Sequence, residues 1–295
     1  MKIEKEISEV NGNIVKEGFI CFFDILGYKN ILENNTINKC AQIINNILLK
    51  LQEKVKSEFT DLSGKPKATR GFSSDDVKSL EEDRKSFFDN YLNIIMVSDS
   101  IVLFFDFTDS GIEIINHTWL ALRYIATFQR EAFIQGLPMR GCLDFGEYYY
   151  HNSLFAGQTI VNSYEKGNNL EFSGVVVTDD AYNRIKIISE QNDFYTKLLD
   201  CVIFRYLYPV KNGQDESGYI IKWYEECDFP ENQDIRQFIY ESFYWYNKNI
   251  DTATVTKINN TEKILRFFLL KCRTLSIRIS TKKDGSATGK SPLME

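Results

Sequence analysis

The feature that most constrains the fold is an alternation of short apolar runs with segments whose apolar residues recur at helical spacing. The first run, residues 17–26 (EGFICFFDIL), ends at Gly27 and is typical of a buried strand that contains one carboxylate. Residues 31–59 follow with Ile, Leu and Val at intervals of three and four, which predicts one or two helices. Continued along the chain, this alternation favours an α+β sheet with helices against one face.

The same alternation extends to residue 226. Two β-rich runs on either side of Ser98-Asp99-Ser100 predict a hairpin. The polar stretch 60–86, rich in Ser, Asp and Lys, predicts a loop or insertion. The other expected elements are a helix over 112–135, a strand over 138–149, a helix before the GVVVT strand at 174–178, a helix over 181–189 and a second hairpin within 201–226.

The pattern changes after Asp228 to long amphipathic runs, over 235–247 and 261–277. We therefore expect three parts, which are an N-terminal segment 1–16, a main domain 17–226 that contains the polar insertion, and a helical extension 227–295 with a disordered tail. The tail contains GSATGKS, but three residues instead of four separate its glycines and no helix follows. A phosphate-binding loop needs both features, so a solvated tail is favoured.

Composition excludes several classes of protein. The six cysteines are scattered without a CxxC pair and the chain has only two histidines, which disfavours zinc sites, disulfide scaffolds and histidine-based catalysis. The net charge of −6 disfavours nucleic-acid binding. The N-terminus lacks the pattern of a signal peptide, and no apolar run is long enough to span a bilayer. We expect a soluble protein of a reducing cytoplasm, with no membrane partner.

Two aspartates stand in strongly apolar surroundings. Asp24 lies inside ICFFDILGY, and Asp99 lies at the tip of IIMVSDSIVLFF. A carboxylate in such a run is costly to bury unless something compensates its charge. Taken singly, Asp24 is explained by capping of a helix that begins near Gly27, and Asp99 by an ordinary turn. Taken together on neighbouring strands, they predict a site for Mg²⁺ or Mn²⁺ holding a triphosphate.

The order of four motifs resembles a known family. FFDILGY, SDS within a hairpin, MRGCLDFGEYYY and GQTIVNSYEKGNNLEFSGVVVT are similar, in sequence order, to the motifs of class III nucleotidyl cyclase domains. The resemblance covers about residues 17–226, and the order of the motifs is more specific than any one of them. Among these enzymes the chain looks most like the bacterial Pycsar pyrimidine cyclases, which make cyclic UMP or cyclic CMP in defence against phage. The resemblance implies a ferredoxin-like core sheet with helices on one face, followed by the helical extension.

The resemblance also implies roles for particular residues. Asp24 and Asp99 match the two aspartates that bind a pair of Mn²⁺ or Mg²⁺ ions, and Ile25 matches the residue whose main-chain carbonyl completes one metal site. The ions would activate the ribose 3′-hydroxyl, bind the triphosphate and support the leaving pyrophosphate. Asn162 matches the asparagine that orients the ribose. Lys166 stands where the family has a transition-state arginine, and it offers positive charge without the bidentate fork of arginine.

Base selection is the clearest departure from the purine cyclases. The positions where those enzymes read the base with polar side chains hold Ile95 and Phe155, which cannot form such hydrogen bonds and favour a pyrimidine substrate. Arg140 is a candidate phosphate ligand, although an ion pair at the edge of its strand explains it slightly better. Tyr28 is a candidate contact to base or sugar, although a core aromatic is the more common role.

Three functions follow as expectations. The first is a homodimeric cyclase that converts UTP to 3′,5′-cyclic UMP and pyrophosphate, with CTP as the alternative substrate. The second is a catalytically inactive cyclase-like domain that binds a nucleotide or a partner; a purine cyclase is disfavoured. The resemblance implies a head-to-tail dimer in which one chain supplies the metals and the other Asn162. It also implies phage infection as the trigger and a separate effector that binds the cyclic nucleotide.

Overall fold

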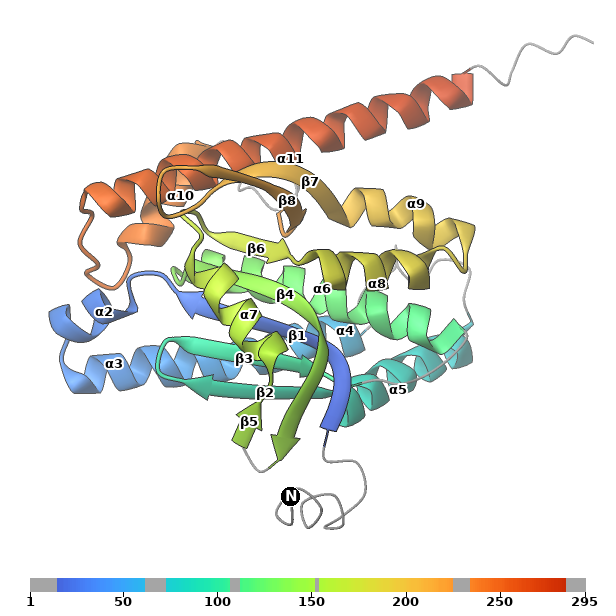
Figure 1. The fold of residues 1–295 in the computed structure, drawn as a ribbon, viewed down its shortest axis with the longest axis horizontal. Coiled ribbons are helices and arrows are strands. Elements are labelled where there is room, and N and C mark those ends of the chain that lie inside the picture. Colours follow the sequence, from blue (N-terminus) through green and yellow to red (C-terminus); the bar gives the residue numbers. More distant parts are fainter. Residues whose placement is uncertain (1–14, 62–72, 107–111, 152–153, 225–233, 285–295) are drawn as a thin grey trace, which may run out of the picture.

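A computed structural model describes residues 15–61, 73–106, 112–151, 154–224 and 234–284 (Figure 1). Its centre is an eight-stranded mixed sheet in the order β2-β3-β1-β4-β6-β8-β7, with β5 paired to β4. Neighbouring strands are antiparallel except for the parallel pair β4 and β6. The strands are β1 (Val15–Ile25), β2 (Leu92–Val97), β3 (Ser100–Phe105), β4 (Met139–His151), β5 (Leu154–Ala156), β6 (Gly174–Val177), β7 (Ile203–Pro209) and β8 (Asp215–Ile221). The predicted α+β class is confirmed.

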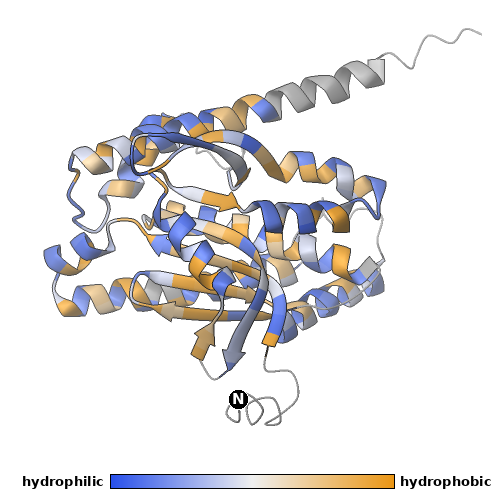
Figure 2. Ribbon diagram, viewed as in Figure 1, coloured by the Kyte–Doolittle hydropathy of each residue, from blue (hydrophilic) through white to orange (hydrophobic). Residues whose placement is uncertain are grey.

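The helices surround this sheet, and Figure 2 shows apolar and polar residues alternating along them, as expected for helices with one buried side. They are α2 (Tyr28–Asn34), α3 (Ile37–Ile43), the π-helix η1 (Ile44–Leu49), α4 (Lys50–Thr60), α5 (Ser74–Tyr91), α6 (Ile112–Ile134), α7 (Gln158–Asn168), α8 (Asp179–Ser189), α9 (Asp193–Val202), α10 (Ile235–Tyr244) and α11 (Thr252–Asp284). None of these helices, within the ranges given above, is long and apolar enough to cross a membrane.

The first face of the sheet carries the larger core. Phe19, Cys21 and Phe23 alternate along β1 and point to this face, where Phe23 meets Phe128 of α6 at 5.6 Å between ring centroids. Helices α3, α4, α5 and α8 add buried residues to the same core. Burying the intervening apolar residues of β1 requires a cover on the opposite face as well.

The second face is covered in two places. Helix α7 lies on it, and its Ile160 packs with Ile20 and Phe22 of β1 (Figure 1). Further along the sheet, α10 and α11 pack on β4, β6, β7 and β8, where Cys142 and Phe268 belong to one buried cluster. The prediction of helices against one face was therefore wrong. The physical reason is that β1 is apolar on both sides between Phe19 and Phe23, so both sides must be shielded from water.

Helix α5 corrects the predicted loop over 60–86. The helix begins at Ser74 and is capped by Ser73, whose side chain accepts from the Asp76 N–H while the Asp76 carboxylate accepts from the Ser73 N–H. Phe87 and Phe88 anchor its end in the core. The prediction was wrong over 74–86 because most of this helix is exposed and its composition resembles that of a loop.

Other predicted boundaries are close to the observed ones. The hairpin around Asp99, the strand at 138–149 and the second hairpin are confirmed as β2–β3, β4 and β7–β8. Helix α9 was not predicted. The second hairpin was expected to begin at Cys201, whereas α9 continues to Val202 and β7 begins at Ile203. Helix α11 is longer than the predicted 261–277. The GSATGKS stretch lies outside the described residues.

Candidate functional site

Asp24 and Asp99 meet at one corner of the sheet. Asp24 lies next to the last residue of β1, and Asp99 lies in the β2–β3 turn, where Ser98 adopts a left-handed φ of 59°. The Ile25 N–H donates to the Asp99 carbonyl at 2.9 Å, and Asp24 is in register with Ser100. The prediction that the two aspartates lie on neighbouring strands is confirmed.

Asp24 forms an ion pair with Arg140 of β4. The Arg140 Nε donates to Asp24 Oδ2 at 2.8 Å, and the two side chains are 11 % and 14 % exposed respectively. The guanidinium also donates to the Leu170 carbonyl at 3.2 Å and to Asn168 Oδ1 at 3.0 Å. Burial raises the pKa of Asp24, and the neighbouring charge of Arg140 only partly opposes this. Arg140 thus has the ion pair that the sequence favoured, whereas the cap of α2 is Gly27 and not Asp24.

A polar cleft lies beside this pair. Its volume is about 680 Å³, and its wall includes three cationic side chains, from Arg140, Lys166 and Lys211, and two carboxylates, from Glu165 and Glu216. Burial lowers the pKa of Lys211, and the charge of Arg140 lowers it further. The amide side chains of Asn168 and Asn169 line the same cleft. Cations and amides converging on one cleft suit an anionic ligand such as a phosphate chain.

Lys211 was not singled out from the sequence. It lies in the turn between β7 and β8, and its N–H donates to the Asn169 carbonyl at 2.8 Å. Nothing local distinguishes the stretch KNG from other hairpin turns. Only the pairing of β8 with β6, beside β4, brings this turn back to Arg140.

An apolar cavity of about 320 Å³ opens on the second face between β2, β3 and α7. Ile95 and Phe155, the two positions singled out for base selection, both line it. Its wall is apolar apart from the hydroxyl groups of Ser100 and Tyr164. Tyr164 also lines the polar cleft, so the two spaces adjoin. The complete lining of the apolar cavity is Phe22, Ile95, Val97, Ser100, Val102, Phe155, Ile160, Val161 and Tyr164.

Asn162 lies on α7 but lines neither space. Gln158 Nε2 donates to Asn162 Oδ1 at 2.9 Å, one helical turn earlier. Asn162 also hydrogen-bonds the carboxylate of Asp144, whose pKa burial raises while hydrogen bonds from Thr178 and Asn162 lower it. The resemblance places Asn162 in a site shared with a second chain, so its role stays a prediction. Lys166, in contrast, shares the polar cleft with Arg140.

Tyr28 begins α2 and belongs to the main core, with 9 % of its surface exposed. Burial raises the pKa of its hydroxyl, and the charge of Asp99 raises it further. Tyr28 is therefore a core aromatic close to the aspartate corner, which matches the more common of its two roles. A contact to substrate stays a prediction.

The corner offers oxygen ligands for a divalent ion. The carboxylates of Asp24 and Asp99 and the carbonyl of Ile25 are the kind of hard donor that Mg²⁺ and Mn²⁺ prefer. Within the described ranges no group of three or more His, Cys, Asp or Glu side chains gathers to hold a metal. Phosphate oxygens and water would therefore complete the coordination, as is usual for Mg²⁺ bound with a nucleotide. To bind the ion, Asp24 would have to give up its ion pair with Arg140.

A scan against models of protein families finds no match, and a search of curated proteins finds none either. The function is therefore argued from the chain's own residues, namely the aspartate corner, the polar cleft and the apolar cavity.

Proposed function

We propose that this chain is a metal-dependent pyrimidine nucleotide cyclase that converts UTP to 3′,5′-cyclic UMP and pyrophosphate. The observation that carries the proposal is the aspartate corner, where Asp24 and Asp99 meet beside the cationic cleft. A nucleoside triphosphate presents the matching chemistry, namely a polyanion that travels with a divalent ion and a flat base.

The residues divide the work between charge and position. Asp24, Asp99 and the Ile25 carbonyl would hold two Mn²⁺ or Mg²⁺ ions, which supply Lewis-acid activation of the ribose 3′-hydroxyl when bound. In the reaction the 3′-oxygen loses its proton and attacks the α-phosphorus. The bond to the bridging oxygen breaks, and pyrophosphate leaves. Arg140, Lys166 and Lys211 would balance the negative charge on the phosphate oxygens, which lowers the barrier without any covalent chemistry from the protein.

The apolar cavity supports a pyrimidine base. Ile95 and Phe155 offer no hydrogen bond to a base edge, so a purine would bury its polar edge there without partners. UTP and CTP differ at one ring position, where a carbonyl replaces an amino group. We therefore keep cytidylate cyclase, with cyclic CMP as the product, as the alternative.

A second copy of the chain would complete the site. Val97, Phe155, Val161 and Tyr164 line the apolar cavity and are nevertheless 39–60 % exposed. An apolar cavity that is open to solvent at its rim favours a covering partner. In the proposed head-to-tail homodimer, Asn162 of one chain would orient the ribose held at the aspartate corner of the other. The product would act as a second messenger in antiphage defence, in the cytoplasm, through a separate effector that binds cyclic nucleotides.

The deciding experiment is to incubate the purified chain with each of the four nucleoside triphosphates and Mn²⁺ and to resolve the products by mass. Cyclic UMP is expected, and cyclic CMP instead would select the alternative. Asp24→Ala and Asp99→Ala should each abolish turnover, whereas Asp89→Ala should not, because Asp89 pairs with Lys56 on the surface. Absence of any cyclic product from a folded dimer would reject the proposal.

One observation favours the second candidate, an inactive nucleotide-binding domain. The Asp24 carboxylate is already neutralised by Arg140, so it has a structural partner without any metal. Under this alternative, calorimetry would show UTP binding while no cyclic product forms. Retained turnover in Asp24→Ala would likewise remove the metal role of Asp24.

A further inference from the structure

A buried lysine lies outside the candidate site. Lys248 follows α10, in a turn where Tyr246 and Asn247 adopt left-handed φ values of 63° and 59°. The side chain is enclosed, with 3 % of the residue exposed. Its Nζ donates to the carbonyls of Gly136 at 2.8 Å and Ser242 at 3.0 Å. A lysine buried against carbonyls alone is costly, so the surrounding packing must hold it in place.

The segment around Lys248 is bonded to the end of α2, and it packs on Gly27 at the start of the same helix. Asn34 Nδ2 donates to the Asn247 carbonyl at 2.7 Å, and Asn35 Nδ2 donates to the Tyr246 carbonyl at 2.8 Å. Gly27 has a left-handed φ of 79°, and a Cβ there would lie 2.9 Å from the Lys248 Cδ. The turn that follows Asp24 and Ile25 therefore packs on the stem of Lys248.

The same segment is fixed to the turn between α6 and β4, just before Arg140. The Tyr246 hydroxyl donates to the Gln135 carbonyl at 2.7 Å. Trp245 packs so closely on Gly136 that a Cβ there would lie 2.5 Å from its ring. Lys248 joins the two turns, because its Nζ binds the Gly136 carbonyl while its stem touches Gly27.

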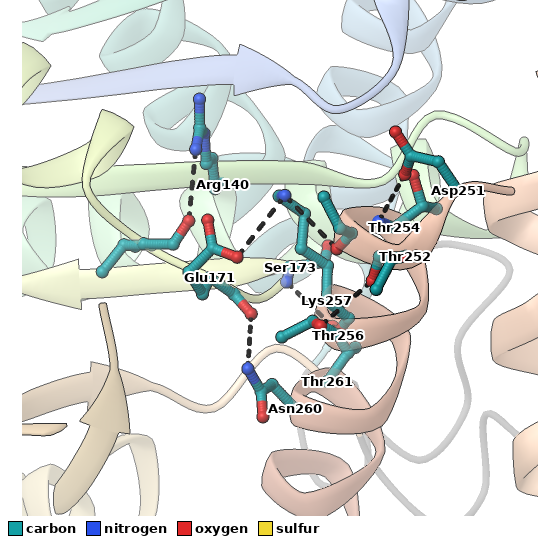
Figure 3. Close-up of polar contacts among 12 residues, drawn as sticks. Arg140, Glu171, Ser173, Asp251, Thr252, Thr254, Thr256, Lys257, Asn260 and Thr261 are labelled. Atoms are coloured by element: carbon teal, nitrogen blue, oxygen red, sulfur yellow. Dashed lines mark hydrogen bonds and ion pairs between the residues drawn. The ribbon is translucent and has the colours of Figure 1, made fainter. Parts of the chain in front are cut away.

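Helix α11 binds a third segment beside the Asp24–Arg140 pair, namely the stretch 170–173 between α7 and β6 (Figure 3). Lys257 pairs with Glu171 at 3.5 Å, and Asn260 Nδ2 donates to the Glu171 carbonyl at 3.0 Å. The Ser173 N–H donates to Thr261 Oγ1 at 2.9 Å. This is the stretch whose Leu170 carbonyl accepts a hydrogen bond from Arg140.

We propose that residues 242–261 form a clasp that positions the Asp24–Arg140 pair. Lys248 is the positioning residue of this clasp, because it contacts both the turn that follows Asp24 and Ile25 and the turn that precedes Arg140. Three segments that border the pair contact this clasp: the turn after Asp24 packs on Lys248, the turn before Arg140 is hydrogen-bonded to it, and so is the stretch beside the Arg140 guanidinium. The C-terminal helices are thereby part of the support of the site and not a separate module. The proposal rests on the proposed function only in treating Asp24 as a metal ligand.

The test compares Lys248→Met with Lys263→Met, a control at an exposed lysine of α11. Hydrogen exchange measured by mass spectrometry should rise about tenfold over residues 134–140 in Lys248→Met, since the buried hydrogen bond to the Gly136 carbonyl is lost. It should also rise over residues 25–31, since the side-chain stem that packs on Gly27 is then no longer held in place. Mn²⁺ affinity, followed by electron paramagnetic resonance, should fall by a similar factor. Lys263→Met should match the wild type in both. Unchanged exchange at both turns in folded Lys248→Met would overturn the proposal.

A second variant covers the case in which Lys248→Met does not fold. Asn35→Ala removes the bonds from Asn35 to the Tyr246 carbonyl and to the Ile31 carbonyl of its own helix, so the informative result is a rise in exchange over residues 245–248 in addition to α2. A rise confined to residue 35 and its neighbours on α2 would contradict the clasp. If the wild type binds no Mn²⁺ the metal role of Asp24 fails, yet the exchange data still decide whether the clasp holds the two turns.

Discussion

A buried carboxylate requires compensation, and in this chain the compensation comes from far along the sequence. Asp24 stands out locally because it interrupts an apolar run, but its partner Arg140 is 116 residues away. The sequence therefore identified both residues without showing that they touch. Pairing between β1 and β4 decides that contact, because it sets Asp24 directly opposite Arg140.

Replacing Arg140 by Met would leave the Asp24 charge buried without a cation. The free energy of unfolding should fall by about 3 kcal/mol at pH 7.5, as for other buried pairs that lose one member. The pKa of Asp24 is already raised in the folded state, and it should rise further in the variant. A raised folded-state pKa means that stability is gained as the carboxylate takes up a proton, so the loss should be smaller at pH 4.5.

Urea denaturation of the Arg140→Met variant at the two pH values measures this difference. The double variant Asp24→Asn, Arg140→Met serves as the control, because without the carboxylate the loss should no longer depend on pH in this range. Equal losses for Arg140→Met at both pH values would show that Asp24 is not left charged and buried.

Lys248 gives the opposite dependence on pH. Burial lowers its pKa from 10.5 to about 7, so between these values the unfolded chain holds a proton that the folded chain has lost. Unfolding then takes up a proton, and raising the pH stabilises the fold by about 1.4 kcal/mol per unit over that window. The free energy of unfolding of Lys248→Met should lack this rise with pH, whereas that of Lys263→Met should show the same rise as the wild type. Parallel stability curves for wild type and Lys248→Met from pH 7 to 9 would refute the burial of a titrating lysine.

At the scale of elements, the sequence predicted best where the apolar pattern was strong. The strands β1 and β3 contain runs of Phe, Ile, Leu and Val that no helix period fits, and both were found. Helix α5 was missed because its buried residues are few and lie near its end, at Phe87 and Phe88. Its start was nevertheless encoded, in the pair Ser73 and Asp76, which makes a capping box.

The cap of α5 can be tested by one substitution. Ser73→Ala removes the side-chain acceptor for the Asp76 N–H, which should cost about 1 kcal/mol of stability, the usual loss for a helix N-cap. Ser74→Ala is the matched control, because Ser74 is an exposed first-turn residue and alanine is the better helix former. Thermal unfolding should rank Ser73→Ala below wild type and Ser74→Ala at or above it; the reverse order would exclude the cap.

At the scale of the whole molecule, the second face of the sheet is covered unevenly. Helices α10 and α11 seal the half formed by β6, β7 and β8, and this seal includes the clasp. The half formed by β2 and β3 carries α7 and the apolar cavity, and its rim is open. No local pattern in the sequence could predict this division, because the central part of β1 and most of β3 are apolar on both sides. The division follows from the position of α10 and α11, which pack on β6, β7 and β8.

That open half predicts how copies of the chain associate. Phe155 and Val161 line the cavity and are 39 % and 44 % exposed, so a charge at either position would enter the proposed interface. Val161→Asp should convert a dimer into a monomer at micromolar concentration in light scattering, because an unpaired carboxylate is strongly disfavoured in an apolar contact. Ile187→Asp is the control, since Ile187 is 57 % exposed on α8, away from the cavity. Dimers of equal strength for both variants would place the association on another face, and a monomeric wild type would contradict the proposed homodimer.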